Sequence, residues 1–356
     1  MQRIKWLVLT VALVLGMAGQ ALAGGADSGP GSLDILKLPE WQVTAGAYGG
    51  RLLLSDSPEM VPADGIMYQD TVVGDARLFF HHVNATTIDK RIVVLLENSG
   101  SEAAEVTVYR SGLAGPGADW LAVGKAAQTA YLADKNLYSV TVPARGTAQL
   151  SPELASAVVR PNMLVNGIFD FQTNRPVTVK VMMLPVGADS AKFARQAKVL
   201  PTDQYRLRGT FAGKDRLLIP DKVYDPAEDG AVVITLGDNV VDRYLEGIDA
   251  TDGSKVLNYG NWGVVYHVFL PFTTSGKVAC YLNPRGGTYA GALGVKYRHA
   301  DQTPVATPAG RLFFGEGVSS DFAAIGKFGG NESLWLTFSP PGASNLPVKL
   351  VIMPGE

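Results

Sequence analysis

The sequence is poor in the residue types that most often carry chemistry or cross-links. It contains a single cysteine, Cys280, and only 4 histidines among 356 residues. One cysteine cannot form an intramolecular disulfide, so stability must come from burial of a core. Cys280 lies between Ala279 and Tyr281, without a recognisable partner that would stabilise its thiolate. We therefore interpret Cys280 as a core residue and not as a nucleophile.

The chain also has no excess of charge of either sign. Lys and Arg total 31 against 33 Asp and Glu, which gives a formal net charge of -2. Nucleic acids and anionic membranes select basic proteins, so we expect neither as a partner. The sequence contains no G-x-S-x-G elbow, H-E-x-x-H pair, P-loop or dinucleotide-binding glycine fingerprint. The sequence therefore contains none of these common catalytic motifs.

Long apolar runs are confined to the N-terminus. A basic start is followed by an apolar stretch over residues 6–17 and by the sequence ALA at residues 21–23. This three-part pattern predicts a cleaved signal peptide at residues 1–23, because the apolar stretch is shorter than the ~20 residues that span a bilayer. Residues 24–33 are small and polar and predict a flexible tether. We expect no transmembrane segment after cleavage and a secreted, periplasmic or cell-surface protein.

The rest of the sequence alternates short apolar runs with Gly, Pro, Asn and Asp, which is typical of a β-sandwich or barrel. We expect strands at residues 41–47, 51–54, 76–82, 91–97, 105–109, 138–142, 164–171, 177–184, 205–211, 216–219, 231–236, 262–271, 277–282, 292–297, 311–314, 333–338 and 347–353. Helical spacing predicts a helix within residues 119–134, and residues 188–198 predict a short linking helix. Strands follow strands without regular intervening helices, which disfavours a parallel α/β fold.

Two parts of the sequence resemble each other. Residues 74–100 align without a gap on residues 260–286, and this alignment places His81 on His267. A second similarity relates residues 179–185 to residues 348–354. Internal similarity of this kind indicates duplicated architecture.

We therefore predict an all-β protein of two tandem antiparallel β-sandwich domains, immunoglobulin-like and related by internal duplication. The predicted first domain covers residues 34–190, a linker covers 191–204, and the second domain covers 205–356.

His81 and His82 form the most obvious candidate pair for metal binding or catalysis. Adjacent residues of a strand point to opposite faces of the sheet, so the two rings cannot easily bind one metal ion. The repeat also preserves only one of them, at His267. We favour a structural role for both.

An acidic stretch in the second half offers oxygen ligands for a cation. It runs from Asp238 through Asp242, Glu246 and Asp249 to Asp252. Calcium binds several carboxylate and carbonyl oxygens that loops hold together, so Asp242, Glu246, Asp249 and Asp252 form a candidate calcium site. The spacing is not that of an EF-hand, and the alternative is a solvated loop with an ordinary Asp-Gly turn.

Aromatic, amide and guanidinium groups gather in two predicted loops of the second half. They belong to Tyr259, Trp262, Asn283, Arg285 and Tyr289. Aromatic rings stack on the apolar face of a sugar, while amides and Arg bond its hydroxyl groups, so we expect these five residues to bind a glycan ligand. The alternative is that Gly and Asn form turns here and that the aromatic residues anchor the core.

The sequence GDARLFFHHVNA at residues 74–85, followed by RIVV at residues 91–94, resembles uncharacterised secreted bacterial proteins of two β-domains. Some of these are labelled copper amine oxidase-like because an accessory N-terminal domain of that type is attached. The resemblance extends roughly over residues 34–354, and its motifs are structural.

The resemblance does not imply amine oxidase activity. Such an enzyme needs a cofactor-forming tyrosine in a T-x-x-N-Y-[DE] context and copper-binding histidines, two of them as H-x-H. Here Asn258-Tyr259 is preceded by Lys255 in place of Thr and followed by Gly260 in place of the acid, and no H-x-H occurs.

The sequence thus favours an exported, non-catalytic envelope or extracellular protein that contacts cell-wall material, glycan or a surface protein. The alternative is a secreted hydrolase of polysaccharides, with carboxylates such as Asp249 and Asp252 in a cleft between the domains. A third interpretation is a structural spacer that only sets a distance.

Overall fold

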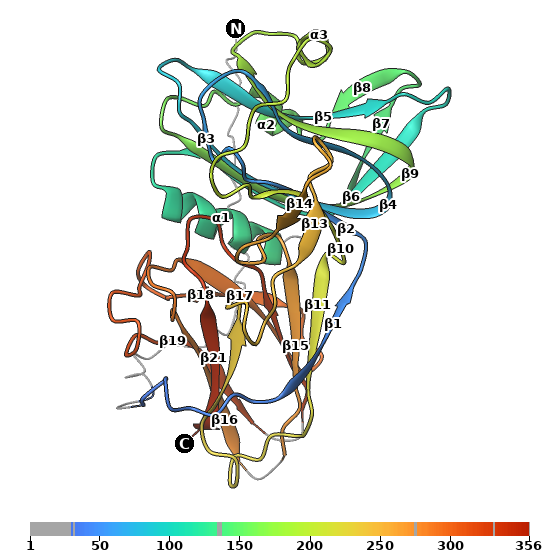
Figure 1. Ribbon diagram of the computed structural model, residues 1–356. Helices are drawn as coiled ribbons and strands as arrows, with labels where there is room; N and C mark the ends of the chain where they lie inside the picture. Colours follow the sequence, from blue (N-terminus) through green and yellow to red (C-terminus); the bar gives the residue numbers. More distant parts are fainter. Residues whose placement is uncertain (1–29, 31–32, 134–136, 274–275, 330–331, 356) are drawn as a thin grey trace, which may run out of the picture.

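The structure is a computed structural model that describes residues 30, 33–133, 137–273, 276–329 and 332–355. The predicted signal peptide lies outside the described residues, as does the predicted tether except for residues 30 and 33. Figure 1 shows two lobes, one above the other, that are built almost wholly from β-strands in three sheets. The prediction of an all-β protein is therefore confirmed.

The first lobe contains the eleven-stranded sheet. Its strands are β2 (Arg51–Ser55), β3 (Met60–Val61), β4 (Gly65–Asn84), β5 (Lys90–Asn98), β6 (Ala104–Gly117), β7 (Tyr138–Val142), β8 (Gly146–Gln149), β9 (Leu164–Pro185), β10 (Arg208–Ala212), β13 (Glu246–Ile248) and β14 (Lys255–Leu257). The main path runs β14-β13-β10-β2-β4-β9-β5-β8, and β6 pairs with both β7 and β9. The paired strands β4 and β9 are 20 and 22 residues long, and they reach from one side of this lobe to the other.

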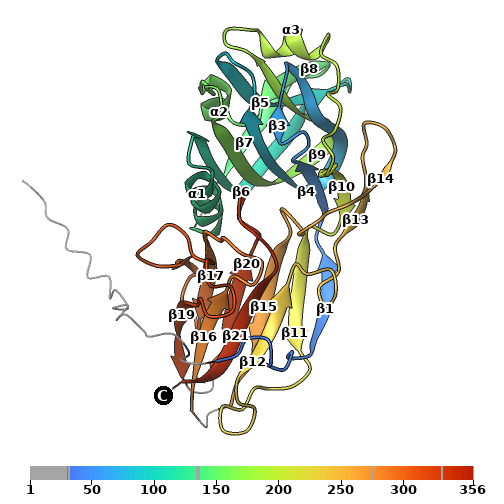
Figure 2. The ribbon, with the colours of Figure 1, turned by 60° about the vertical axis from the view of Figure 1, so that its left-hand side comes forward.

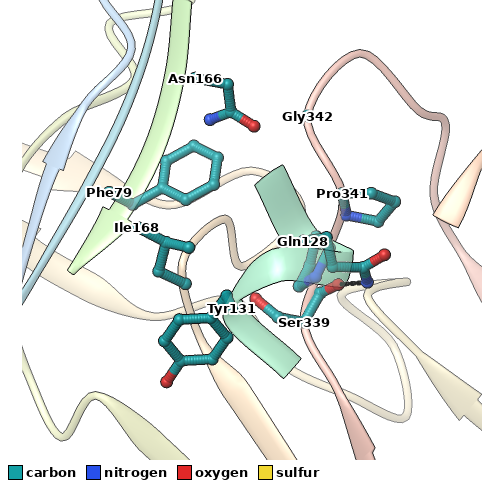
Figure 3. Close-up of a pocket in the computed structure, with 9 residues that line it drawn as sticks. Phe79, Gln128, Tyr131, Asn166, Ile168, Ser339, Pro341 and Gly342 are labelled. Carbon is teal, nitrogen blue, oxygen red and sulfur yellow. Dashed lines mark hydrogen bonds between the residues drawn. The ribbon is translucent and has the colours of Figure 1, made fainter. Parts of the chain in front are cut away.

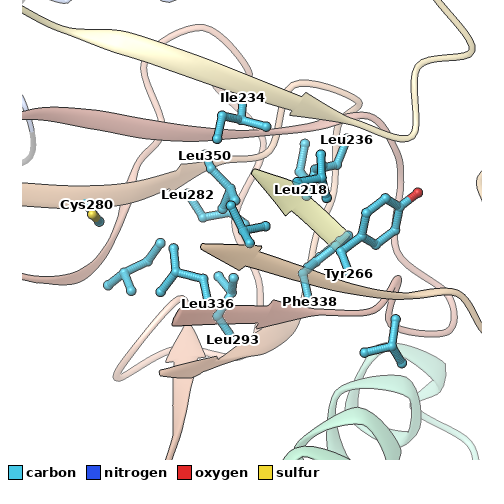
Figure 4. Packing of buried hydrophobic residues seen from close by; sticks show 14 of the residues in the cluster. Leu218, Ile234, Leu236, Tyr266, Cys280, Leu282, Leu293, Leu336, Phe338 and Leu350 are labelled. Carbon is cyan, nitrogen blue, oxygen red and sulfur yellow. The ribbon is translucent and has the colours of Figure 1, made fainter. Parts of the chain in front are cut away.

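The second lobe is a sandwich of a six-stranded and a four-stranded sheet (Figure 2). The larger sheet has the order β1 (Val43–Tyr48), β11 (Asp215–Pro220), β15 (Val265–Leu270), β20 (Leu334–Phe338), β17 (Gly291–Tyr297) and β18 (Thr303–Thr307). The smaller sheet has the order β12 (Val232–Leu236), β21 (Val348–Gly355), β16 (Lys277–Asn283) and β19 (Ala323–Gly329). Leu282, Leu336 and Leu350 meet between the two sheets (Figure 4). Cys280 lies in the same core, as expected.

The first strands of the two lobes are exchanged. β1 precedes β2 in the sequence, but it pairs with β11 of the second lobe. β10 precedes β11, but it pairs with β2 of the first lobe. The chain therefore passes between the lobes from β1 to β2 and from β10 to β11, and it passes twice more because β13 and β14 lie between β12 and β15 in the sequence. The pairing thus crosses the boundary that we expected at residues 191–204.

Helix α1 (Trp120–Ala133) lies between the lobes and confirms the predicted helix at residues 119–134. Val123, Ala127 and Tyr131 are buried at intervals of four residues and lie on one side of α1. The helix packs against β6 and β9 of the first lobe and against β17 and β18 of the second. The other helices are α2 (Pro152–Ser156) and α3 (Ser190–Ala194), and α3 is the shorter form of the predicted linking helix.

The predicted strands agree with the structure, with three corrections, and six strands were not predicted: β3, β8, β13, β14, β18 and β19. Residues 164–171 and 177–184 belong to the single strand β9. The predicted strand at 311–314 is wrong, because only Phe314 forms an isolated bridge, to Tyr289. The sheets are also not wholly antiparallel, because β2 with β4, β3 with β4 and β11 with β15 form parallel pairs.

A similar order of pairing occurs in both lobes. β4 pairs in parallel with β2 and antiparallel with β9, while β15 pairs in parallel with β11 and antiparallel with β20. The internal duplication and the immunoglobulin-like class nevertheless stay predictions. No helix in the described part of the chain is long and apolar enough to cross a membrane.

Glycines allow α1 to sit closely against both lobes, which leads to a first prediction. A Cβ atom at Gly124 would lie 1.8 Å from the carbonyl oxygen of Gly342. Gly124→Ala must push α1 away from residues 339–344, so we expect a loss of about 1–3 kcal/mol in the free energy of unfolding. Gly329→Ala is the control, because its Cβ would meet nothing closer than a Lys277 side-chain carbon at 3.6 Å. Equal melting temperatures for both variants would contradict this close packing.

Candidate functional site

The outer face of the six-stranded sheet carries a continuous apolar and aromatic surface. The strand register places Gly46, Leu217, His267 and Thr337 in one row across the sheet. The next row follows two residues along each strand and contains Thr44, Ile219, Phe269 and Trp335. We call Tyr48, Leu217, Ile219, His267, Phe269 and Trp335 the open face.

The side chains of the open face are accessible to solvent although most are apolar. Tyr48 is 45% exposed and Ile219 is 43% exposed, and the other four are partly exposed. The rings of Phe269 and Trp335 have centroids 4.8 Å apart, and those of Tyr48 and His267 are 6.1 Å apart. The open face thus presents two pairs of contacting rings on one sheet.

Alternation along β15 explains how this surface arises. Tyr266, Val268 and Leu270 are buried in the sandwich core. Successive residues of a strand point to opposite faces, so His267 and Phe269 must point outward. On the outer face of β15 only Val265, the first residue, is buried, while His267 and Phe269 are partly exposed.

A buried charged network lies where the open face meets the first lobe. Arg77 of β4 donates from Nε to Asp170 of β9 at 2.6 Å, and its Nη2 lies 2.9 Å from a carboxylate oxygen of Asp215 in β11. Its Nη1 donates to the carbonyl oxygens of Lys214 and Gly263 at 2.6 and 3.2 Å. One guanidinium group therefore binds both lobes.

Two tyrosines and a lysine complete this network. Tyr131 of α1 donates to Asp170 at 2.6 Å. Lys214 donates to the hydroxyl oxygen of Tyr109 at 2.6 Å, and its Nζ lies 3.2 Å from Asp75. Tyr109 is 38% exposed, so the network reaches solvent beside the open face.

The network keeps Arg77 and Asp170 charged. Burial alone would lower the pKa of Arg77, but Asp170, Tyr131 and Asp215 raise it well above its usual value. Burial would likewise raise the pKa of Asp170, but Arg77 and Lys214 hold it below its usual value. Both groups therefore stay ionised at neutral pH, which a buried pair requires if it is to stabilise the fold.

The five residues that we expected to bind a glycan do not form one surface. Tyr259 is 54% exposed and contacts Tyr244, while Trp262 is partly buried against Phe79. Asn283 and Tyr289 are completely buried.

The buried members of this set have structural contacts. Asn283 donates to the backbone carbonyls of Val318 and Asp321, and Tyr289 packs against Phe314. Arg285 is partly exposed.

The acidic residues that we expected to bind calcium bind arginines instead. Asp242 accepts from Arg216, and it also accepts from the hydroxyl group of Tyr266 at 2.6 Å. Asp249 is completely buried and accepts from Nε of Arg208 at 2.7 Å.

The other two acidic candidates do not complete a metal site. Asp252 lies 3.6 Å from Arg206, and Glu246 is exposed at the start of β13. Within the described ranges, no three His, Cys, Asp or Glu side chains lie close enough together to hold a metal ion. The calcium site therefore has no geometric support.

The two adjacent histidines have different surroundings. His82 lies 2.8 Å from the hydroxyl oxygen of Ser55 through Nε2 and 2.9 Å from the carbonyl oxygen of Pro58 through Nδ1. This Ser-His contact resembles that of a nucleophile and its base, but both side chains are completely buried and no substrate reaches them. His81 is buried near Gly342 and lies 3.7 Å from Glu59.

Two hollows occur elsewhere in the described part of the chain. A cavity of about 10 Å³ at α1 is lined by residues that include Phe79, Asn166 and Gln128 (Figure 3). It has room for one water molecule at most. An open hollow of about 450 Å³ is lined by residues from Arg311 to Asp321.

Sequence reasoning missed most of the open face. The missed residues, Tyr48, Leu217, Ile219, Phe269 and Trp335, all lie in strands, whereas the sequence predicts the ligand-binding groups in loops. The signal was present in strands such as β15 and β20 that are apolar on both faces. Such strands are either buried on both sides or leave an apolar face open.

Comparisons with known proteins give no functional argument. No family model matches the chain, and no curated protein matches it. Among solved structures, the CUB1-EGF-CUB2 domains of rat MASP-1 align over 87% of this chain and 97% of that chain, with 9% identity and a TM-score of 0.20. Oxalate decarboxylase of Lactobacillus farciminis aligns over 87% and 88%, with 10% identity and a TM-score of 0.14. TM-scores this low do not establish a common fold.

A second prediction concerns the ion pair between the lobes. Asp170→Asn leaves the buried charge of Arg77 without its main partner, so we expect the free energy of unfolding to fall by about 3–5 kcal/mol. Glu102→Gln is the matched control, because Glu102 pairs with Arg175 and the two side chains are 64% and 47% exposed. We expect that control to cost less than about 1 kcal/mol. Urea unfolding measures both, and a small loss for Asp170→Asn would refute the importance of the network.

A third prediction concerns pH. Burial lowers the pKa of His81 to about 3 and that of His82 to about 4. In the unfolded chain the histidine pKa values are ~6.5. At pH values between the folded and the unfolded pKa values, the unfolded chain binds more protons than the folded chain. The free energy of unfolding therefore falls as pH drops below about 6.5. From pH 6 to pH 5 each histidine should remove about 1 kcal/mol from the free energy of unfolding.

The test compares unfolding at these two pH values in three proteins. His81→Gln should reduce the loss by about 1 kcal/mol relative to the original chain. His299→Gln is the control for the removal of a histidine, because His299 is exposed and lies outside the buried pair. An unchanged loss in His81→Gln would show that His81 is charged in the folded protein.

Proposed function

We propose that this protein is an exported, non-catalytic binding module that contacts cell-envelope or extracellular glycan through the open face. The observation that carries the proposal is the set of partly exposed rings on one sheet, with Phe269 and Trp335 in contact and Tyr48 beside His267. Monomeric proteins rarely leave a continuous apolar surface of this kind without a use for it.

The composition of the open face suits a polysaccharide. A sugar ring has an apolar side that stacks on aromatic rings, and its edge carries hydroxyl groups that need hydrogen-bonding partners. The rings of Trp335 and Phe269 offer the first kind of contact. His267 lies at the end next to the first lobe and offers the second.

Rigidity of the strands supports the same role. Tyr48, Phe269 and Trp335 lie on paired strands of one sheet, so little conformational entropy is lost when a ligand binds. Lys296 of β17 lies beside Trp335 in the register and places an exposed charge at the margin of the open face. Such a surface is less suited to a permanent protein interface, whose core is depleted of charge.

Several expectations from the sequence belong to this proposal. Export to a secreted, periplasmic or cell-surface location follows from the predicted signal peptide at residues 1–23. The resemblance to secreted bacterial two-domain β-proteins is consistent with it. The similar pairing order in the two lobes supports two immunoglobulin-like sandwiches related by duplication.

Co-sedimentation with isolated cell envelopes and insoluble polysaccharides tests the proposed function. We expect saturable pelleting of the purified protein with at least one glycan. Trp335→Ala should lower the association constant about tenfold, because a lost ring contact costs up to about 1.5 kcal/mol. Tyr259→Ala is the matched control, since Tyr259 is an exposed aromatic residue outside the open face.

The other outcomes identify the competing interpretations. Loss of binding in Tyr259→Ala but not in Trp335→Ala would place the site in the loops that we favoured from the sequence. Release of reducing sugar would favour the hydrolase. Pelleting only with protease-sensitive envelopes would indicate a surface protein as partner. No pelleting at all would refute glycan binding and favour a spacer.

A further inference from the structure

Strand β1 has an unpaired edge that is unusual in this fold. β1 is the end strand of the six-stranded sheet and pairs only with β11. Its sequence is VTAGAY, without charge or proline, and five of its six residues are exposed. In Figures 1 and 2 it forms the outer margin of the second lobe. An exposed uncharged edge strand is a template for pairing with another strand.

In the first lobe, β10 holds the position that corresponds to β1 and has a paired strand on each side. β10 lies next to β2, as β1 lies next to β11. The far side of β10 pairs with β13, so both edges of β10 are occupied. Among the described residues, β1 has no such neighbour on its far side.

The other sheet ends are protected in ways that β1 is not. β14 contains Lys255, β18 contains Pro304 and β19 contains Lys327. β12 is covered, because the N–H of Val233 donates to the carbonyl oxygen of Pro39 at 3.0 Å. The short end strands β7 and β8 of the first lobe lie against each other. Charges, prolines and covering segments are the usual means of preventing edge pairing.

Hydrogen bonding at the end of β1 shows which groups face its free edge. The N–H of Asp221 donates to the carbonyl oxygen of Gln42 at 3.1 Å, so residue 42 faces β11. Backbone groups alternate between the two edges of an antiparallel strand. The N–H and C=O groups of Val43, Ala45 and Ala47 therefore point to the free edge.

We propose that β1 pairs with β1 of a second copy of this chain, antiparallel and centred on Ala45. Groups that face the free edge must meet each other, which sets Ala45 opposite Ala45 and Val43 opposite Ala47. This register brings small side chains together and places no like charges opposite each other. A two-fold axis perpendicular to the sheet then joins the two six-stranded sheets into one.

The proposed dimer has a consequence that rests on the proposed function. A two-fold axis perpendicular to the joined sheet keeps both open faces on the same side. Tyr48 lies on β1, so the two open faces become neighbours across the dimer contact. One polysaccharide chain can then bind two sites, which raises avidity without any new contact within one copy. A pairing of six residues is a small interface, so we expect a reversible dimer.

Sedimentation equilibrium over a range of concentrations up to millimolar tests the dimer without any glycan. We expect the purified protein to approach twice its monomer mass as its concentration rises. Ala45→Lys places two lysines opposite each other and should weaken the dimer about fivefold or more. Thr303→Lys is the matched control, because Thr303 is exposed on β18 at the other end of the same sheet. That control should dimerise like the original chain.

A mixture of two variants tests the register. Ala45→Lys and Ala45→Asp should each be more monomeric than the original chain, and a mixture of the two should form a heterodimer. A monomer at every concentration, or a dimer that Ala45→Lys does not weaken, would overturn the proposal. Failure of the mixture to pair would overturn the register. A dimer without glycan binding would leave this inference standing and refute only the proposed function.

Discussion

The joining of the two lobes depends on the buried guanidinium group of Arg77. It donates to Asp170 within the first lobe and to the carbonyl oxygens of Lys214 and Gly263 in the second. It also donates to Tyr131 of α1 at 2.8 Å. A buried charge is costly unless every group around it is paired, so this arrangement holds only when the lobes and the helix are all in place. The network therefore specifies the arrangement of the lobes as well as stabilising it.

The strand exchange and the network act on the same part of the chain. The turn between β10 and β11 contains Lys214, so the segment that crosses between the lobes is also the segment that Arg77 binds. β11 begins immediately after it, at Asp215, and leads into the open face. Leu217 and Ile219 follow on this strand and point outward, because Leu218 between them is buried in the sandwich core.

Most strands could be predicted from the sequence, because their signals are local. These signals are the short apolar runs and the Gly, Pro, Asn and Asp residues that end them. The sequence predicted α1 because Val123, Ala127 and Tyr131 repeat at helical spacing. It could not predict the strand exchange, because the pairing of β1 with β11 and of β10 with β2 joins strands far apart in the sequence. The strand expected at 311–314 failed because the chain bends at residues 308–312 and turns again at 316–320, which leaves only Phe314 extended and bridged. The open face was missed because an apolar strand such as β20 gives no sign of which face meets solvent.

The most direct test of the account is hydrogen-deuterium exchange with and without soluble cell-wall oligosaccharides. Backbone amides of β11, β15 and β20 are the ones beneath the open face. We predict slower exchange in these strands when an oligosaccharide binds, and no change in the loop that contains Tyr259. Protection confined to that loop or to residues 311–321, with the three strands unchanged, would contradict the assignment of the open face as the binding surface.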